Sequence, residues 1–198
     1  MTLSKCRLFL VVPSSLAARA ARVCLEEALT AGDVAAVKVT GSAPDQERLL
    51  DGVLAIAQSA GIAVLTEDDV DLALKRMTDG VEIGADVSRL AAARSMLGES
   101  AIVAARCGTS RHEAMEMAEA GADYVALEAG SGGGESLVAW WAELFEVPCV
   151  AVLAPGEARQ AIADGADFLV PPANMWASPE KARSEVAELT AMITEAGA

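Results

Sequence analysis

The feature that most constrains the fold is a glycine that recurs ahead of a short run of apolar or β-branched residues. The instances are Gly32-Asp33-Val34, Gly61-Ile62-Ala63, Asp79-Gly80-Val81, Gly121-Ala122-Asp123 and Gly165-Ala166-Asp167. Each glycine is expected to end a helix in the left-handed conformation, which glycine adopts at low cost, with a strand following it. The steps from Gly80 to Gly121 and from Gly121 to Gly165 are each close to twice a unit of roughly 20 residues. The sequence therefore predicts one helix-to-strand unit used repeatedly.

Hydrophobic runs and turn signals place these units along the chain. Strands are expected at residues 7–12, 34–40, 62–65, 80–83, 101–106, 124–128, 149–153 and 168–170. Helices are expected at residues 15–31, from about 44, at 70–77 and 88–97, after 110, at 136–145 and 157–163, and from 179. Ser42 with Asp45, and Ser110 with Glu113, have the spacing of capping boxes.

Eight strands, each followed by a helix, predict a closed parallel (β/α)8 TIM barrel. Residues 1–198 are expected to form a single domain, because 53% hydrophobic content in a chain of this length suits one core. Aromatic residues make up only 4% of the chain, so the core is built from small aliphatic residues. An open doubly wound sheet is the alternative, but it predicts fewer strands, and no Gly-x-Gly-x-x-Gly follows the first strand.

The charge and the cysteines restrict the partners and the compartment. A formal net charge of −14 repels nucleic acid and anionic membrane surfaces, so neither is expected as a partner. A small phosphorylated molecule would need Mg²⁺ or a local cluster of basic residues. Cys6, Cys24, Cys107 and Cys149 are far apart, which makes a zinc site improbable. We find neither a secretory signal nor a membrane span, and expect a cytoplasmic protein.

Charged residues occur at the carboxyl ends of the predicted strands, where the chemistry of a barrel resides. Alternation along each strand directs Lys38 and Glu82 into the barrel, together with Glu128. These three side chains are expected to share one interior layer, with Arg106 at the end of the fifth strand. One interpretation is an active-site ion cluster; the other is a paired polar plug without turnover. Schiff-base chemistry at the enclosed Lys38 is a third possibility.

Two further segments carry candidate binding residues. Asp68 and Asp86 could coordinate Mg²⁺ across neighbouring strands, although the acidic run at residues 67–71 could instead cap a helix. The glycine-rich loop at residues 130–134 could hold a phosphate through its backbone amides, or could be a linker. Its candidate binding residues are Ser131, Gly132 and Gly133.

The same positions carry a resemblance to a known family. Residues 67–74, Glu-Asp-Asp-Val-Asp-Leu-Ala-Leu, and residues 79–84, Asp-Gly-Val-Glu-Ile-Gly, resemble the thiamine phosphate synthase motifs Asn-Asp-Arg-x-Asp-Leu-Ala-Leu and Asp-Gly-x-His-x-Gly-Gln. The approaches to the sixth and eighth strands are also similar. The resemblance implies a homodimeric TIM barrel that joins a hydroxymethylpyrimidine diphosphate to a thiazole phosphate, releasing pyrophosphate with the help of Mg²⁺.

This chain departs from the family pattern at several binding positions. The family's Gln-x-Arg-x-Lys after the second strand falls on Lys38, Thr40 and Ser42. Its second metal-binding aspartate aligns with Val87, which leaves the adjacent Asp86 as a substitute. The family's histidine after the fourth strand is Glu82 here. Other changed positions are Glu67, Cys107, Leu153, Ala154, Pro172 and Ala173.

Two functions of different class follow from the resemblance. In a Mg²⁺-dependent transferase, Asp68 and Asp86 would hold the metal, and Lys38 and Arg106 would bind the diphosphate. Lys38 and Glu82 are the expected catalytic residues. Substrate binding is expected at Arg106, Glu128, Ser131, Gly132 and Gly133. The alternative is a noncatalytic barrel of the same superfamily that binds another small ligand or a protein partner.

Overall fold

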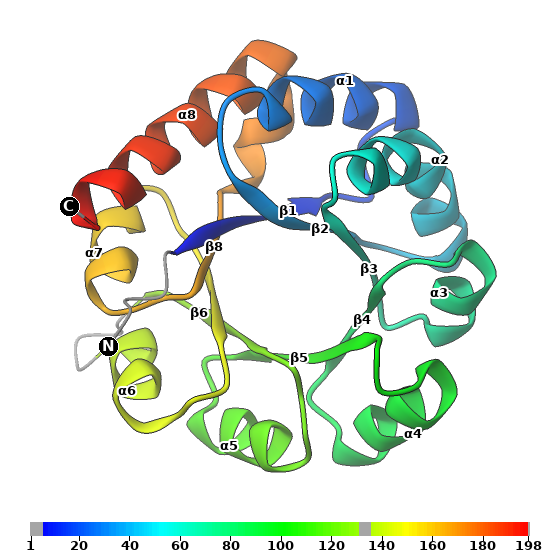
Figure 1. The fold of residues 1–198 in the computed structure, drawn as a ribbon, viewed down its shortest axis with the longest axis vertical. Helices are drawn as coiled ribbons and strands as arrows, with labels where there is room; N and C mark the ends of the chain where they lie inside the picture. The colour runs from blue at the N-terminus through cyan, green and yellow to red at the C-terminus, as the bar shows by residue number, and fades with distance from the viewer. Residues whose placement is uncertain (1–5, 131–135, 198) are drawn as a thin grey trace.

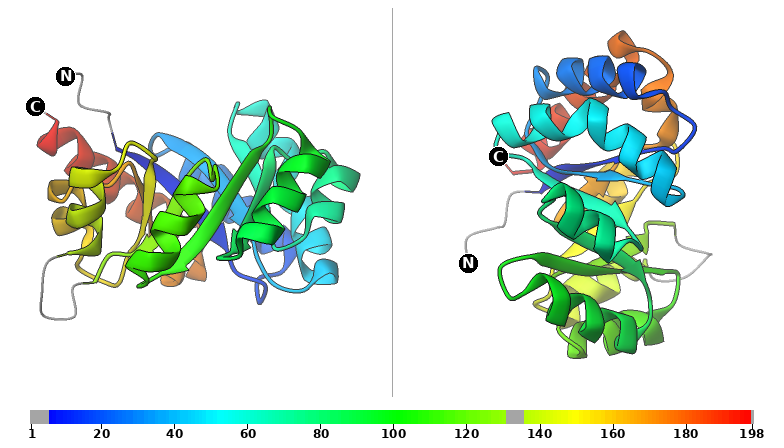
Figure 2. Two further views of the ribbon diagram at one scale, coloured as in Figure 1. Left: turned by 90° about the horizontal axis from the view of Figure 1, so that it is seen from below. Right: turned by 90° about the vertical axis from the view of Figure 1, so that its right-hand side faces the viewer.

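The chain folds into a closed ring of eight parallel strands surrounded by helices (Figure 1). The structure is a computed structural model, and it describes residues 6–130 and 136–197. Each strand pairs with its neighbours in sequence, and β8 pairs with β1 to close the ring. The side views show strands that run at a tilt to the barrel axis, as closure of such a ring requires (Figure 2). The predicted (β/α)8 barrel is confirmed.

The strands are β1 (Arg7–Val12), β2 (Val34–Val39), β3 (Ala63–Glu67), β4 (Gly80–Gly84), β5 (Ile102–Gly108), β6 (Val125–Glu128), β7 (Cys149–Val152) and β8 (Phe168–Val170). The helices are α1 (Ala18–Leu29), α2 (Ala43–Ser59), α3 (Val70–Arg76), α4 (Val87–Leu97), α5 (Arg111–Glu119), α6 (Leu137–Leu144), α7 (Ala158–Ala163) and α8 (Pro179–Ala196). A 3₁₀ helix, η1 (Ala173–Ala177), precedes α8 and was not predicted.

The glycine interpretation is confirmed at three of its five positions. Gly61, Gly121 and Gly165 follow helices and have φ values of 70°, 91° and 92°, in the left-handed region. It is wrong for Gly32 and Gly80, which do not have positive φ. A Cβ at Gly32 would lie 1.9 Å from Thr190 Oγ1, and one at Gly80 would lie 1.9 Å from the Ile102 carbonyl oxygen. Close packing against backbone therefore requires the glycine at Gly80, whereas the atoms close to Gly32 belong to the side chains of Thr190 and Val186.

One of the two predicted capping serines is confirmed as an N-cap, although its own amide donates to the Cys107 carbonyl oxygen and not to the glutamate of a full capping box. Ser110 is the N-cap of α5, and its hydroxyl accepts a hydrogen bond from the Glu113 amide at 3.2 Å. Ser42 precedes α2, but its hydroxyl donates to the Asp45 carboxylate at 2.5 Å and caps no backbone amide. The short-range pairing of hydroxyl and carboxylate therefore replaces the cap that the spacing predicted.

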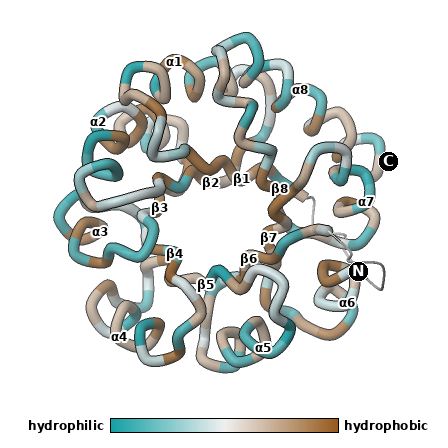
Figure 3. The backbone as a smooth tube through the Cα atoms, turned by 180° about the vertical axis from the view of Figure 1, so that it is seen from behind, coloured by the Kyte–Doolittle hydropathy of each residue, from teal (hydrophilic) through white to brown (hydrophobic). Residues whose placement is uncertain are grey.

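The sheet separates two apolar layers, and the strands are the most hydrophobic part of the tube (Figure 3). The outer layer lies between the strands and the helices and contains Val37, Val81 and Ile83 among many others. A smaller cluster, which includes Phe9, Leu65, Tyr124 and Val150, fills the inside of the barrel. This inner cluster forms an apolar floor beneath the charged carboxyl ends of the strands.

All four cysteines are buried and unpaired, as expected for small core residues. Within the described part of the chain, no helix is both long and apolar enough to cross a membrane.

The close approach at Gly80 generates a stability prediction. Gly80→Ala places a methyl group against the backbone of β5, which cannot move aside without breaking the β4–β5 pairing. We expect a loss of unfolding free energy of about 3 kcal/mol, at the upper end of overpacking costs. Gly121→Ala, where a Cβ would meet nothing within 4 Å, should cost only about 1 kcal/mol for its positive φ. Urea unfolding of both variants measures the difference, and equal costs would contradict it.

Candidate active site

The charged side chains of the barrel gather at the carboxyl ends of β2, β3, β4 and β5. Lys38 lies on β2, Glu67 ends β3, Glu82 lies on β4 and Arg106 lies on β5. Two positions before Lys38, Glu67 and Arg106 on the same strands lie Ala36, Leu65 and Ala104, which belong to the inner apolar cluster. Alternation along each strand therefore turns these four side chains into the barrel above the apolar floor. We call this charged end of the barrel the mouth.

Lys38 and Glu82 form the buried centre of the mouth. Lys38 is 5% exposed and Glu82 is 1% exposed. The Lys38 ammonium group donates a hydrogen bond to Glu82 Oε1, and the Tyr124 hydroxyl donates to Glu82 Oε2 at 3.0 Å. The expectation that Lys38 and Glu82 share one interior layer is confirmed by this contact. Burial of the carboxylate is tolerated because both of its oxygens are hydrogen-bonded and its charge is paired.

Glu67 and Arg106 form a second tier that reaches toward solvent. Glu67 is the register partner of Glu82 on the neighbouring strand, so two carboxylates lie side by side. Arg106 Nη1 binds Glu67 Oε1 at 2.8 Å and lies 3.6 Å from Glu82 Oε1, while Lys38 Nζ lies 3.7 Å from Glu67 Oε1. The two cations bridge the two carboxylates and offset the repulsion between them.

Asp68 connects this tier to α4. Its backbone is in the left-handed region, with φ of 56°, and its amide donates to the Glu82 carbonyl oxygen at 2.9 Å. Its Oδ1 accepts from the Gly84 amide at 2.9 Å and binds Arg89 Nη2 at 2.8 Å. Its Oδ2 binds Arg106 Nη2 at 3.0 Å. The strained backbone thus turns the carboxylate toward two guanidinium groups.

Partial burial alone would raise the pKa of Asp68, but the Gly84 amide and the two guanidinium groups outweigh it and lower the pKa below its usual value. Asp68 therefore stays ionised near neutral pH. The ion-pair network between β2 and β5 joins three cations, Lys38, Arg89 and Arg106, to three carboxylates, those of Glu67, Asp68 and Glu82. The formal charges of these six side chains cancel, in contrast to the net charge of −14 of the chain as a whole.

The other predicted site residues lie outside this network or outside the described residues. Glu128 ends β6 and is exposed, so the prediction that it shares the interior layer with Lys38 is wrong. The strand ends at this residue, which is exposed, whereas the three residues before it are buried. Its role in substrate binding stays a prediction. Ser131, Gly132 and Gly133 lie outside the described residues.

The carboxylate oxygens of Asp68 and Asp86 are not arranged as the ligands of a resident Mg²⁺ site. Both oxygens of Asp68 are held by arginines, and Asp86 Oδ1 accepts from the Arg89 amide at 3.0 Å as the N-cap of α4. Within residues 6–130 and 136–197, no three His, Cys, Asp or Glu side chains are grouped to hold a metal ion. A divalent cation at Asp68 would also meet repulsion from Arg89 and Arg106. The assignment of Mg²⁺ to Asp68 and Asp86 stays a prediction.

The acidic run at residues 67–71 has a structural role as well. Asp69 is the N-cap of α3, and its Oδ1 accepts from the Leu72 amide at 2.8 Å. Capping therefore explains Asp69, whereas Glu67 and Asp68 belong to the mouth.

The rim beside β7 and β8 offers few free backbone donors. The Ala154 amide, which follows β7, donates to Glu157 Oε2 at 2.7 Å. The nearby residues Pro155, Pro171 and Pro172 have no amide hydrogen. This side of the mouth therefore presents a carboxylate where a bound phosphate would need a donor.

Sequence reasoning did not assign roles to several residues that build the mouth. Gln46, on α2 and 1% exposed, donates to the Gly41 and Glu67 carbonyl oxygens at 2.9 and 2.8 Å and accepts from the Glu67 amide at 2.7 Å. It fixes the end of β3 against the loop after β2. Arg89 gave no sequence signal. Tyr124 gave one, because it is the only tyrosine and stands at an inward position.

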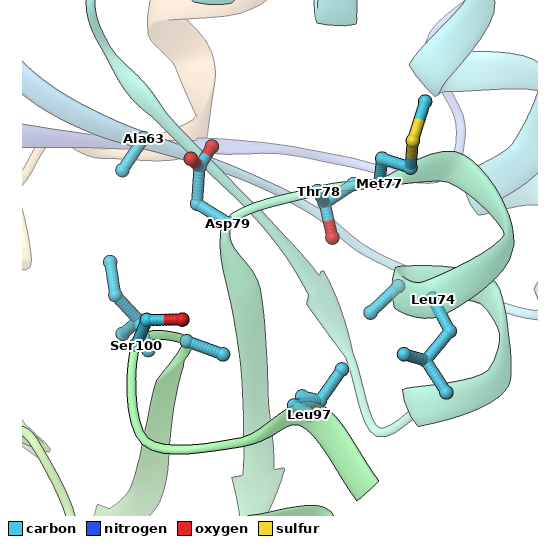
Figure 4. Close-up of a pocket in the computed structure, with 10 residues that line it drawn as sticks. Ala63, Leu74, Met77, Thr78, Asp79, Leu97 and Ser100 are labelled. Atoms are coloured by element: carbon cyan, nitrogen blue, oxygen red, sulfur yellow. The ribbon is translucent and has the colours of Figure 1, made fainter.

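A pocket of about 430 Å³ opens at the opposite end of the barrel, among the loops that precede β4 and β5. Its labelled lining residues are Ala63, Leu74, Met77, Thr78, Asp79, Leu97 and Ser100 (Figure 4). The carboxylate of Asp79 accepts from the Val64 amide at 2.7 Å and so supports the start of β3. The mouth, with its grouped ionisable side chains, is the better candidate for chemistry.

Comparison with known proteins shows what this chain is similar to. The sequence model of a family described as thiamine monophosphate synthase matches residues 8–171. The thiamine-phosphate synthase of Rhodospirillum centenum is 34% identical over 94% of this chain and 97% of its own length. The enzyme of the same name from Erythrobacter litoralis is 37% identical over 80% of this chain and 83% of its own.

Among solved structures, a thiamine phosphate pyrophosphorylase from Pyrococcus furiosus superposes with a TM-score of 0.77. The match covers 99% of both chains at 19% sequence identity. At that identity the likeness concerns the barrel fold.

The buried ion pair generates a stability prediction. Lys38→Met leaves Glu82 without its closest cation, and we expect a loss of unfolding free energy of about 3–5 kcal/mol. Adding Glu82→Gln to this variant removes the buried charge while keeping an acceptor for Tyr124, so at least half of the loss should return. Lys75→Met is the matched control, because Lys75 pairs with Glu47 at 2.7 Å on the surface. Its cost should stay below about 1 kcal/mol. Urea unfolding showing equal costs for Lys38→Met and Lys75→Met would contradict the assigned burial.

The single tyrosine allows a spectroscopic test of the same centre. Burial, followed by the charge and hydrogen bond of Glu82, raises the pKa of Tyr124 well above its usual value of about 10. Native protein should therefore show no tyrosinate absorbance near 295 nm at pH 10.5, whereas urea-unfolded protein titrates near pH 10. Because the folded pKa is the higher one, this group stabilises the fold below about pH 10, and its contribution is lost as the pH rises further. A native midpoint near 10 would contradict the contact.

Proposed function

The chain belongs to the thiamine monophosphate synthase family, and from this premise we propose that it is a divergent thiamine phosphate synthase-like transferase. Its proposed substrates are a hydroxymethylpyrimidine diphosphate and a thiazole phosphate, and its proposed second product is pyrophosphate. The observation that carries the proposal is the meeting of Lys38, Arg89 and Arg106 at the carboxyl ends of the strands. This is the end of a (β/α)8 barrel where substrates bind.

Exchange of ion-pair partners explains how this charge-balanced network can bind an anion. The Arg89 and Arg106 side chains are 48% and 41% exposed, so a diphosphate arriving from solvent reaches them directly. Guanidinium groups bind phosphoryl oxygens in a forked geometry, and a diphosphate carries more charge than the single carboxylate it displaces. Lys38 lies deeper, beside Glu82, and would receive the end of the diphosphate nearest the pyrimidine.

The same side chains provide the charges that the transfer requires. The bond between the pyrimidine methylene carbon and the diphosphate oxygen breaks, and its electron pair leaves with pyrophosphate. Lys38 and Arg106 stabilise that developing negative charge. Glu82, released from Lys38, is a carboxylate positioned to stabilise the developing positive charge on the methylene carbon. The thiazole then forms the new bond to this carbon.

The remaining features of the proposal concern its setting. The proposed partners are small phosphorylated molecules, and neither nucleic acid nor a membrane is proposed, in line with the net charge of −14. A cytoplasmic homodimer is proposed by resemblance to the family. Sedimentation of the purified protein would test the oligomeric state.

A noncatalytic, ligand-binding barrel is the second candidate. It is favoured by the contact between the Ala154 amide and Glu157, which removes a backbone donor from the side of the mouth where a thiazole phosphate would bind. In this function a ligand would occupy the mouth without transfer.

A direct product assay and calorimetry separate the two candidate functions. Purified protein is incubated with both substrates, with Mg²⁺ or with EDTA, and thiamine phosphate is measured by chromatography. For the transferase we expect product in the wild type and a loss of at least about 100-fold in kcat/KM for Arg106→Gln, because the leaving diphosphate loses a charged contact.

Arg159→Gln is the control for this loss. Arg159 forms an exposed ion pair with Glu195 at 3.3 Å, between α7 and α8, and its variant should keep wild-type activity. If no product forms in either condition while titration of the pyrimidine diphosphate still releases heat, the transferase is excluded and the binding barrel is supported.

A further inference from the structure

Two arginines bind the carboxylate of Asp68, which the family resemblance assigns to a metal. Arg89 Nη2 binds Asp68 Oδ1 at 2.8 Å, and Arg106 Nη2 binds Asp68 Oδ2 at 3.0 Å. Each oxygen of Asp68 thus has its own guanidinium group. The two groups come from different elements, α4 and β5, so they approach the carboxylate from two sides.

The two guanidinium groups bring the same total charge as one divalent cation. The position of the family's second metal-binding aspartate is Val87, and the neighbouring Asp86 is engaged as the cap of α4. The acidic ligands that would hold Mg²⁺ are therefore reduced to Asp68, while the positive charge at that place is supplied by side chains. Arginine remains charged at every physiological pH, so this charge is permanent.

We propose that Arg89 and Arg106 take the place of a divalent metal and bind a diphosphate group directly, with Asp68 as the resident anion that the diphosphate displaces. This inference rests on the proposed function for the class of ligand. Binding is an exchange in which the diphosphate gains two forked contacts and Asp68 turns to solvent. Glu67 competes for Arg106, which it binds at 2.8 Å, whereas Arg89 forms its ion pair with Asp68 at 2.8 Å.

The proposal and a metal site predict opposite effects of one substitution. If Asp68 held a metal, Asp68→Asn would weaken diphosphate binding. If Asp68 competes for the arginines, Asp68→Asn removes the competing charge and tightens binding. Asparagine also tolerates the positive φ at this position, so the backbone is preserved.

Isothermal titration calorimetry with inorganic pyrophosphate tests the proposal on the full chain. We expect the Kd in EDTA and the Kd in excess Mg²⁺ to agree within about 3-fold, and Mg²⁺ alone to release no binding heat. We expect Asp68→Asn to lower the Kd by about 3-fold to 10-fold, and Arg89→Gln or Arg106→Gln to raise it by at least about 10-fold.

The opposite end of the barrel supplies a matched control. Arg94, also on α4, binds Asp123 Oδ2 at 2.6 Å, and Asp123 accepts the Val103 amide at 2.7 Å, much as Asp68 accepts the Gly84 amide. Asp123→Asn makes the same change of charge in the same kind of contact, far from the mouth. It should leave the Kd for pyrophosphate unchanged, and circular dichroism checks that each variant is folded.

Several results would overturn the proposal. These are tightening by Mg²⁺ of more than about 10-fold, weaker binding in Asp68→Asn, and absence of pyrophosphate binding at millimolar concentration in both conditions. The outcomes are independent of turnover. Pyrophosphate binding in EDTA without any thiamine phosphate formation would support the arginine pair and exclude the transferase, whereas product formation together with pyrophosphate binding only in Mg²⁺ would support the transferase and overturn the arginine pair.

Discussion

Two carboxylates from neighbouring strands, Glu67 and Glu82, lie in register at the mouth of the barrel, and the other charged side chains are arranged to neutralise them. Lys38 and Arg106 bridge the pair, and Asp68 then balances Arg106 together with Arg89. Because the barrel wall excludes water from the lower tier, each charge there needs a partner within contact distance. The geometry of the mouth is therefore fixed by electroneutrality before any ligand arrives.

The fold could be predicted from the sequence because each element carries its own local signal. The bounds of β1 and β8 agree with the predicted ranges, and α5 begins at the Ser110 cap. Predictions failed where a contact distant in sequence decides the outcome. Gly80 is required by the backbone of β5 rather than by a turn, and no local pattern reveals which strand lies beside it. Ser42 has the spacing of a capping residue, but its hydroxyl donates to the Asp45 carboxylate.

The centre of the site could be predicted for the same reason, and its periphery could not. Alternation along a strand is a period of two, so it assigns Lys38 and Glu82 to the inside without any knowledge of the rest of the chain. Glu128 obeys the same alternation, yet the end of β6 leaves it exposed. Gln46 and Arg89 extend long side chains from helices, Gln46 to the last residue of β3 and Arg89 to Asp68 just after it, and their reach depends on the helix positions around the ring. Side-chain reach of this kind has no sequence period.

The mouth has two halves that differ in their capacity for anions. The half formed by β2 to β5 holds cations whose partners can be exchanged, since Arg89 and Arg106 reach solvent. The half formed by β7 and β8 places the Glu157 carboxylate on the Ala154 amide, and Pro155 offers no donor. Under the proposed function, a diphosphate would be attracted to the first half, whereas a phosphate at the second half would have to displace the Glu157 carboxylate from the Ala154 amide. For the proposed transferase, binding of the second anionic substrate beside β7 is therefore the less favourable step, because Glu157 must first leave the Ala154 amide.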